Sequence, residues 1–147
     1  MNKHPAVLYI DDEYYMLDCM AGTFEVVEMQ IATASSGREG LEMLRENSGI
    51  RVVMSDYRMP GMNGIEFLET VARRHPSSVR ILLSGYVDQS EIEYAITSGT
   101  VHHFIKKPWD LTRLVSLVCK ALDTSESDDT EPLHPPMFMP HQTFLPA

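Results

Sequence analysis

Short apolar runs alternate along the chain with longer amphipathic stretches. In residues 14–27 the apolar positions recur three or four apart, which is typical of one face of a helix. The run "RVVMS" at 51–55 is apolar over almost its whole length, as expected of a strand buried on both faces. The pattern predicts strands at 6–10, 29–34, 51–55, 79–84 and 101–106, and helices at 14–27, 36–47, 65–74, 88–98 and 110–122.

Local signals support several of these helix boundaries. Ser36 precedes Glu39 by three positions, which is the spacing of a capping box at a helix N-terminus. Pro76 is expected to stop the helix before it, and Gly99 to end the next one. Asp110 is placed to cap the last helix.

Five strands that alternate with five helices predict an α/β domain with a parallel sheet covered on both faces. In such doubly wound sheets, ligands bind outside the carboxyl ends of the strands, near the point where the strand order reverses. The residues that follow each strand are therefore where chemistry is expected.

Composition changes this picture mainly near the C-terminus. The chain has 147 residues and a formal net charge of −9, and residues 123–131 carry five acids and no base, which leaves about −4 for the rest. We expect a domain over 1–122, followed at 123–147 by an acidic and then Pro-rich flexible tail or linker. The acidic balance argues against direct binding of nucleic acid. The absence of a long apolar run argues against a membrane span, so the expected location is cytoplasmic.

The two cysteines, Cys19 and Cys119, both fall in apolar helical patterns. We expect free thiols buried in the core rather than a disulfide.

The predicted strand ends bring distinctive side chains to one edge of the sheet. They are Asp11 and Asp12, Asp56, Ser84, and Lys107. Clustered carboxylates repel one another and need a cation or protons to coexist. Oxygen ligands from few protein groups suit Mg²⁺. A carboxylate beside such an ion can attack phosphorus and form an acyl phosphate, which makes Asp56 a candidate phosphoryl acceptor.

Four ordered segments, "YIDDE", "MSDYRMPGMNG", "ILLSGY" and "FIKKPWD", resemble the response-regulator receiver domain of bacterial two-component signalling. The resemblance covers residues 5–122. It implies the flavodoxin-like fold, with five parallel strands in the order 2-1-3-4-5 and five helices. The motifs look most like those of receivers linked to cyclic-dinucleotide phosphodiesterase or transcriptional output domains.

The resemblance implies a set of roles at the acidic edge. Asp56 would accept a phosphoryl group from the phosphohistidine of a histidine kinase or phosphotransfer protein. Asp12 and Asp56 would bind Mg²⁺ through their side chains, Arg58 through its backbone carbonyl, and Asp11 through a metal-bound water. Lys107 would contact the phosphoryl group, with the peptide bond to Pro108 in the cis form.

The resemblance also implies residues that move on phosphorylation and residues that set the rate of dephosphorylation. Ser84 would move to hydrogen-bond a phosphoryl oxygen, and Phe104 would then turn inward. Since Phe104 lacks the hydroxyl of the tyrosine found in many members, its part would depend on packing alone. The side chains of Arg58 and Tyr86 occupy the positions that tune dephosphorylation.

The output of such a receiver is expected through residues 88–121, which would contact a downstream protein or output domain and could form a homodimer. On this interpretation the protein is not an enzyme with an external substrate. One alternative is a scaffold that binds partners without phosphorylation, although a scaffold has no need of the whole acidic set. Another is a Mg²⁺-dependent aspartyl-phosphate phosphatase of the haloacid-dehalogenase type, which would need a second Asp where this chain has Arg58.

Overall fold

The computed structural model of the chain describes residues 5–85 and 88–126. In this part of the chain five strands and five helices alternate, as the pattern predicts. They are β1 (Val7–Ile10), α1 (Tyr14–Val26), β2 (Ile31–Ala34), α2 (Gly37–Glu46), β3 (Val52–Asp56), α3 (Gly64–Arg74), β4 (Val79–Ser84), α4 (Gln89–Thr97), β5 (His103–Lys106) and α5 (Leu111–Glu126). The last helix runs a few residues past the expected end of the domain.

The strands form one parallel sheet in the order β2-β1-β3-β4-β5, which confirms the predicted fold class. The register sets the carboxyl edge of the sheet: Asp56 at the end of β3 pairs with Leu83, and Ser84 at the end of β4 pairs with Lys106. The strand order reverses beside β1. The neighbouring ends of β1 and β3 therefore form the switch point at which this class of sheet binds ligands.

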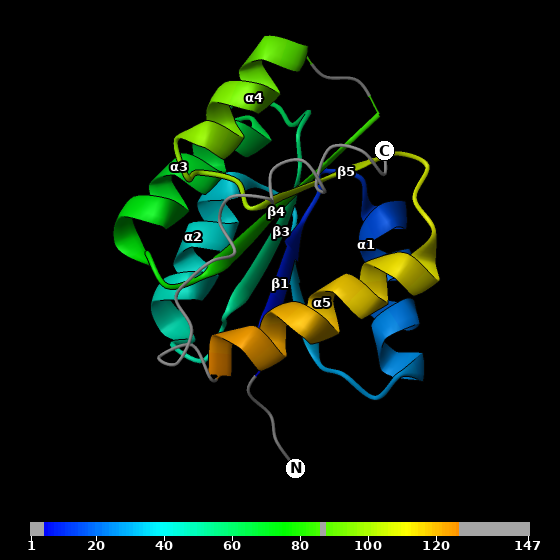
Figure 1. The fold of residues 1–147 in the computed structure, drawn as a ribbon. Coiled ribbons are helices and arrows are strands. Elements are labelled where there is room, and N and C mark those ends of the chain that lie inside the picture. Colours follow the sequence, from blue (N-terminus) through cyan, green and yellow to red (C-terminus); the bar gives the residue numbers. More distant parts are fainter. Residues whose placement is uncertain (1–4, 86–87, 127–147) are drawn as a thin grey trace.

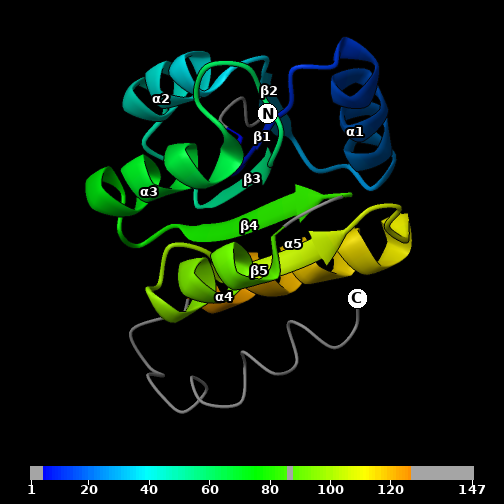
Figure 2. The ribbon, with the colours of Figure 1, turned by 90° about the horizontal axis from the view of Figure 1, so that it is seen from above.

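The sheet is covered by helices on both faces (Figures 1 and 2). Helices α1 and α5 lie on one face, and α2, α3 and α4 lie on the other. Side chains alternate along each strand, so Val7 and Tyr9 of β1 join the cluster under α1 and α5, while Leu8 and Ile10 join the cluster under α2 to α4. This two-sided burial explains why the central strands are apolar at nearly every position.

Helix starts are fixed by side-chain caps. The Ser36 hydroxyl accepts from the backbone N–H of Glu39, as predicted, at 3.1 Å. The Glu39 carboxylate does not return to Ser36 but accepts from the N–H of Ser35 at 2.8 Å. A full capping box forms instead at α3, between Asn63 and Glu66.

The prediction of buried thiols was wrong, although both cysteines are free as expected. Cys19 and Cys119 are exposed. Each lies one position away from a buried residue, Met20 in α1 and Val118 in α5. One position along a helix is a rotation of about 100°, which takes a side chain off a narrow apolar stripe.

A buried arginine stabilises the end of the sheet opposite the carboxyl edge. Arg80, near the start of β4, is 5% exposed. Its guanidinium donates to the backbone oxygens of Thr100, Gly99 and Ser78 at 2.9, 3.0 and 3.1 Å. It thus ties the loop after α4 to β4. Burial lowers the pKa of this guanidinium, while the carbonyl oxygens compensate it.

Among the residues that the structure describes, no helix combines the length and apolarity needed to cross a bilayer. The expected tail falls mostly outside the described residues, and so does Tyr86.

We predict that Arg80→Ala lowers the free energy of unfolding by about 3 kcal/mol, because it strips buried carbonyl oxygens of their donors. Urea denaturation measures this change. The matched control is Arg73→Ala, since Arg73 is exposed on α3 and its guanidinium makes a long hydrogen bond to the Thr70 hydroxyl at 3.4 Å. Equal effects of the two substitutions would contradict the assigned role of Arg80.

Candidate functional site

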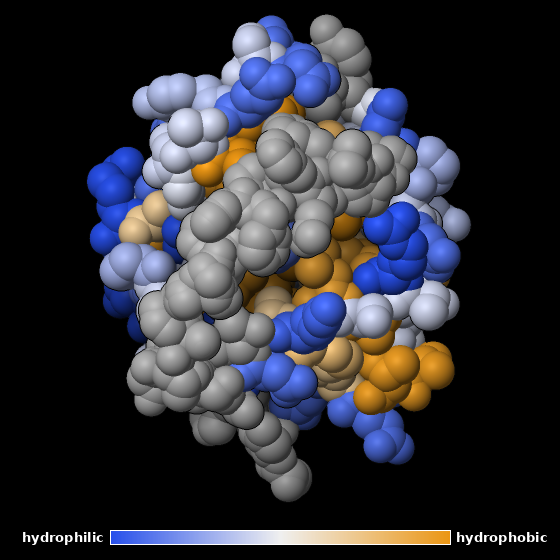
Figure 3. All heavy atoms as spheres, viewed as in Figure 1, coloured by the Kyte–Doolittle hydropathy of each residue, from blue (hydrophilic) through white to orange (hydrophobic). Residues whose placement is uncertain are grey.

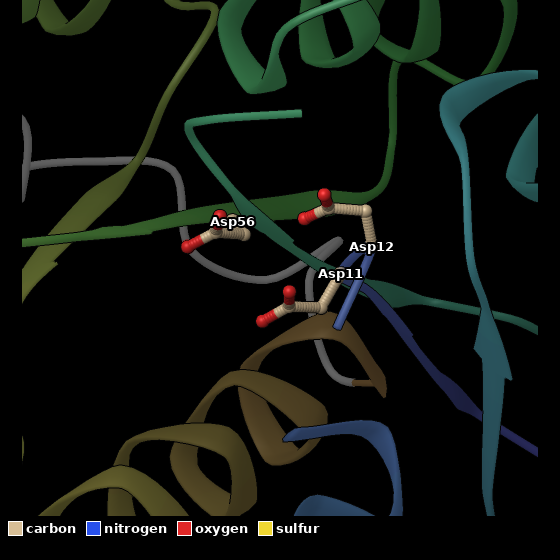
Figure 4. A group of neighbouring side chains, drawn as sticks. All are labelled: Asp11, Asp12 and Asp56. Carbon is tan, nitrogen blue, oxygen red and sulfur yellow. The ribbon is translucent and has the colours of Figure 1, made fainter. Parts of the chain in front are cut away.

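Three carboxylates meet at the carboxyl edge of the sheet. Asp11 and Asp12 follow β1 directly, and Asp56 ends the adjacent strand β3. One ligand oxygen from each side chain lies within 4.8 Å of the others. Figure 4 shows the three side chains projecting from these two strand ends into a shared region. The predicted cluster therefore forms.

Helix α3 begins close to the end of β3, which carries Asp56. The N–H of Gly64, the first residue of α3, donates to the backbone oxygen of Tyr57 at 2.8 Å. A Cβ atom at Gly64 would lie 2.2 Å from the backbone oxygen of Asp56, which is too close for any side chain. Glycine is therefore required at this position for α3 to pack against the end of β3.

Lys107 completes the charged group. Its ammonium lies 2.7 Å from Oδ1 of Asp56, and its backbone N–H donates to the oxygen of Ser84 at 2.8 Å. The Lys107–Pro108 peptide bond is cis, as predicted. The ammonium also lies 5.8 Å from the centre of the Trp109 ring, within the range of a cation–π contact.

The electrostatics of this group favour a cation. Three carboxylates and one ammonium carry a net charge of −2 at neutral pH. Burial raises the pKa of the Asp56 carboxyl above its usual range; the hydrogen bond from Lys107 opposes this, and the charge of Asp11 adds to it. Hard oxygen donors with excess negative charge match what Mg²⁺ binds, so the residues present fit that ion.

Asp11 has two partners that the sequence analysis did not find. The carboxylate is 1% exposed. Its Oδ2 accepts from the hydroxyl of Tyr9 at 2.5 Å, and its Oδ1 accepts from the N–H of Glu13 at 3.0 Å. Burial and this hydrogen bond raise the pKa of Tyr9. The spacing could have indicated the contact, because residues two apart on a strand face the same side.

Ser84 and Phe104, for which a switch role is predicted, lie on the adjacent strands β4 and β5. Ser84 is buried at the end of β4, and Phe104 of β5 pairs with Leu82, two residues before it. Both side chains therefore face the side of the sheet that α4 covers. The Phe104 ring is buried in the cluster under α2 to α4. Its inward turn on switching stays a prediction, since the structure records one position of the ring.

Of the two positions expected to tune dephosphorylation, the structure describes Arg58. Arg58 is exposed and lines an open depression together with Asp12 and Asn63. It is thus close to the acidic cluster, while Tyr86 lies outside the described residues.

A second tyrosine beside the site was also missed. Tyr57 follows Asp56, and its hydroxyl donates to Oε1 of Glu91 in the first turn of α4 at 2.7 Å. This hydrogen bond raises the pKa of Tyr57 to about 12. The contact spans 34 positions of sequence, so no local pattern could have indicated it.

We predict that Asp56→Asn stabilises the protein in EDTA at neutral pH, by roughly 0.5–2 kcal/mol. The pKa of Asp56 is higher in the folded than in the unfolded chain, so the ionised form costs stability at any pH above that folded-state value. The advantage of the variant should shrink as the pH falls through the folded-state pKa and vanish below the unfolded-state pKa.

Denaturant melts at several pH values measure this difference. Asp18→Asn, at an exposed position of α1, controls for the loss of one acid. A destabilised Asp56→Asn variant at neutral pH would contradict the prediction.

Comparison with known proteins agrees with this geometry. Residues 7–119 match the response regulator receiver domain family. The match spans more than half of the chain, so the chain belongs to that family. Its fold and the order of its strands are those that the resemblance implied.

Individual relatives share the same domain. The chain is 34% identical over 122 residues to the hydrogenase transcriptional regulatory protein HoxA of Cupriavidus necator, a match that covers 83% of this chain and 25% of that protein. It superposes with a TM-score of 0.78 and 26% identity on the receiver domain of an HD domain-containing protein from Pseudomonas fluorescens Pf-5, covering 85% and 99% of the two chains. A response regulator receiver domain from Clostridium thermocellum gives a TM-score of 0.77 and 28% identity, covering 83% and 97%.

The chain spans about a quarter of the length of the curated HoxA relatives that it matches. The similarity therefore concerns their receiver portions, and what the whole relatives do is not transferred by it.

Proposed function

We propose that this receiver is a phosphorylatable switch in which Asp56 accepts a phosphoryl group from a phosphohistidine. The observation that carries the proposal is the position of Asp56. Asp56 is buried, lies in one cluster with Asp11 and Asp12, and forms an ion pair with the Lys107 ammonium. A structural ion pair would need only the lysine and one acid, whereas a phosphoryl acceptor uses the whole set.

In the proposed reaction, a carboxylate oxygen of Asp56 attacks phosphorus. The new P–O bond forms as the P–N bond to the donor imidazole breaks, and the imidazole nitrogen keeps the electron pair. Asp11, Asp12 and Asp56 would hold Mg²⁺, which when bound supplies positive charge to the phosphoryl oxygens. Lys107 would leave the carboxylate oxygen and pair with the phosphoryl group, which carries more negative charge than the carboxylate.

The output would follow from movement of Ser84. Its hydroxyl, at the end of β4, would hydrogen-bond a phosphoryl oxygen, and Phe104 would repack on the same face of the sheet. We propose that this shifts an existing equilibrium of the α4–β5–α5 side, residues 88–121, toward a form that a downstream protein or output domain binds.

The surface of that side carries both apolar and polar side chains, which supports a role in protein contacts. Figures 1 and 3 view the molecule with α4, β5 and α5 toward the reader, and among the coloured residues apolar side chains appear between hydrophilic ones. Tyr94 of α4 is 68% exposed. Pairing of two copies through this face is the proposed homodimer, and we place the protein in the cytoplasm without direct contact to nucleic acid.

We predict that acetyl phosphate with Mg²⁺ adds one phosphoryl group to the protein, and that Asp56→Asn abolishes the addition. Intact mass spectrometry measures it, with EDTA as the metal-free control. The matched variant is Asp18→Asn, which should label like the parent chain. Unchanged labelling of Asp56→Asn would contradict the proposed acceptor, and no labelling of the parent chain would favour the scaffold alternative.

We also predict that Lys107→Met slows this labelling by about 100-fold or more, because one charged partner of the transferring group is lost. Lys106→Met is the control, since Lys106 is exposed on β5 and is the immediate neighbour of Lys107. Rates come from the time course of the mass shift. Equal rates for the two variants would exclude Lys107 from the reaction.

A phosphatase with external substrates is disfavoured by the residue at position 58. An arginine stands two positions after Asp56 and cannot act as the general acid for a leaving group. Steady hydrolysis of a generic phosphomonoester would overturn this view.

A further inference from the structure

Tyr9 is a buried polar residue that the proposed phosphoryl transfer does not use. It lies in the middle of β1 and is fully buried in the cluster under α1 and α5. Its hydroxyl is the one polar atom that its side chain brings into this apolar layer, so it needs a partner there. That partner is the Asp11 carboxylate.

The hydrogen bond from Tyr9 holds the Asp11 carboxylate in place against repulsion from its neighbours. Asp11 is 1% exposed and lies beside two further carboxylates, Asp12 and Asp56. Lys107 neutralises Asp56, at 2.7 Å, and no ion pair to Asp11 is found among the described residues. Asp11 accepts instead from the Tyr9 hydroxyl and the N–H of Glu13, one to each oxygen. Without the hydroxyl, repulsion would turn Asp11 away from its neighbours.

We propose that Tyr9 is a positioning residue for the cation site, which holds the Asp11 carboxylate beside Asp12 and Asp56 so that the three carboxylates face Mg²⁺ together. This inference rests on the proposed function. Tyr9 does not touch the cation or the phosphoryl group and acts only through Asp11. Partners that orient ligands from behind a metal site typically change metal affinity by 10- to 100-fold when removed.

The test is the Mg²⁺ affinity of Tyr9→Phe, which keeps the ring and removes only the hydroxyl. Trp109 is the single tryptophan of the chain and lies against Lys107, so its emission reports on changes around Asp56. Titration with MgCl₂ should show a half-saturating concentration roughly tenfold higher than in the parent chain. Isothermal titration calorimetry provides an independent reading of the same constant.

A double-mutant cycle separates positioning from a general loss of packing. Asp11→Asn should weaken Mg²⁺ binding alone, and adding Tyr9→Phe to it should cause no further loss. Tyr94→Phe, at an exposed position of α4, controls for the chemical change. Thermal unfolding verifies that each variant is folded, and Tyr9→Met serves as a second donor-free variant if Tyr9→Phe does not fold.

The outcomes are distinct. An unchanged half-saturating concentration in Tyr9→Phe, or a loss of equal size in the Asp11→Asn background, would overturn the role of Tyr9. A parent chain that shows no response to Mg²⁺ by either method would overturn the proposed cation site and the role of Tyr9 together.

Discussion

Repulsion among three carboxylates at one edge of the sheet is the constraint on which the rest of the site depends. Parallel strands bring their carboxyl ends to the same edge, so the fold itself forces Asp11, Asp12 and Asp56 together. Asp11 and Asp56 are buried, so water does not screen the repulsion between their charges. The molecule must compensate this charge, and the surrounding structure shows how it does so.

Two groups of the structure compensate part of this charge. Lys107 reaches Asp56 from the end of β5, and its own position is set by a backbone bond to Ser84 of β4. Tyr9 reaches Asp11 from within the apolar layer. The cluster keeps a net negative charge, and Asp12 is its exposed member. A divalent cation would neutralise that remainder.

The two ends of the sheet have opposite characters. At the carboxyl edge, charges are crowded and burial raises the pKa of Asp56, so its ionised form is disfavoured there. At the other edge, Arg80 satisfies the carbonyl oxygens that follow α4. Helix α4 is therefore anchored at its C-terminus by Arg80 and tied near its N-terminus by the bond from Tyr57 to Glu91. The second tie starts from Tyr57, the residue that follows Asp56.

Periodicity and strand ends were enough to predict the elements, the sheet and the acidic cluster, because these depend on local pattern and on the rule that parallel strands end together. The strand ends also placed Lys107 at this edge, where its ammonium pairs with Asp56. The contact of Lys107 with a phosphoryl group, which the family resemblance implied, stays a prediction. The Tyr9–Asp11 contact joins positions two apart on one strand, so the alternation of side chains could have indicated it. The roles of Tyr57 and Arg80 depend on side-chain contacts across strands and loops, which periodicity does not encode. The exposed cysteines show the same limit, since one position along a helix separates core from surface.

The central claim is that Asp56 forms an acyl phosphate, and reductive trapping tests it most directly. Borohydride reduces an acyl phosphate to an alcohol and would convert a phosphorylated Asp56 to homoserine. After incubation with acetyl phosphate and Mg²⁺, we predict that tandem mass spectrometry of peptides finds homoserine at position 56. Homoserine at another aspartate, or a phosphoryl label that borohydride leaves in place, would contradict the account.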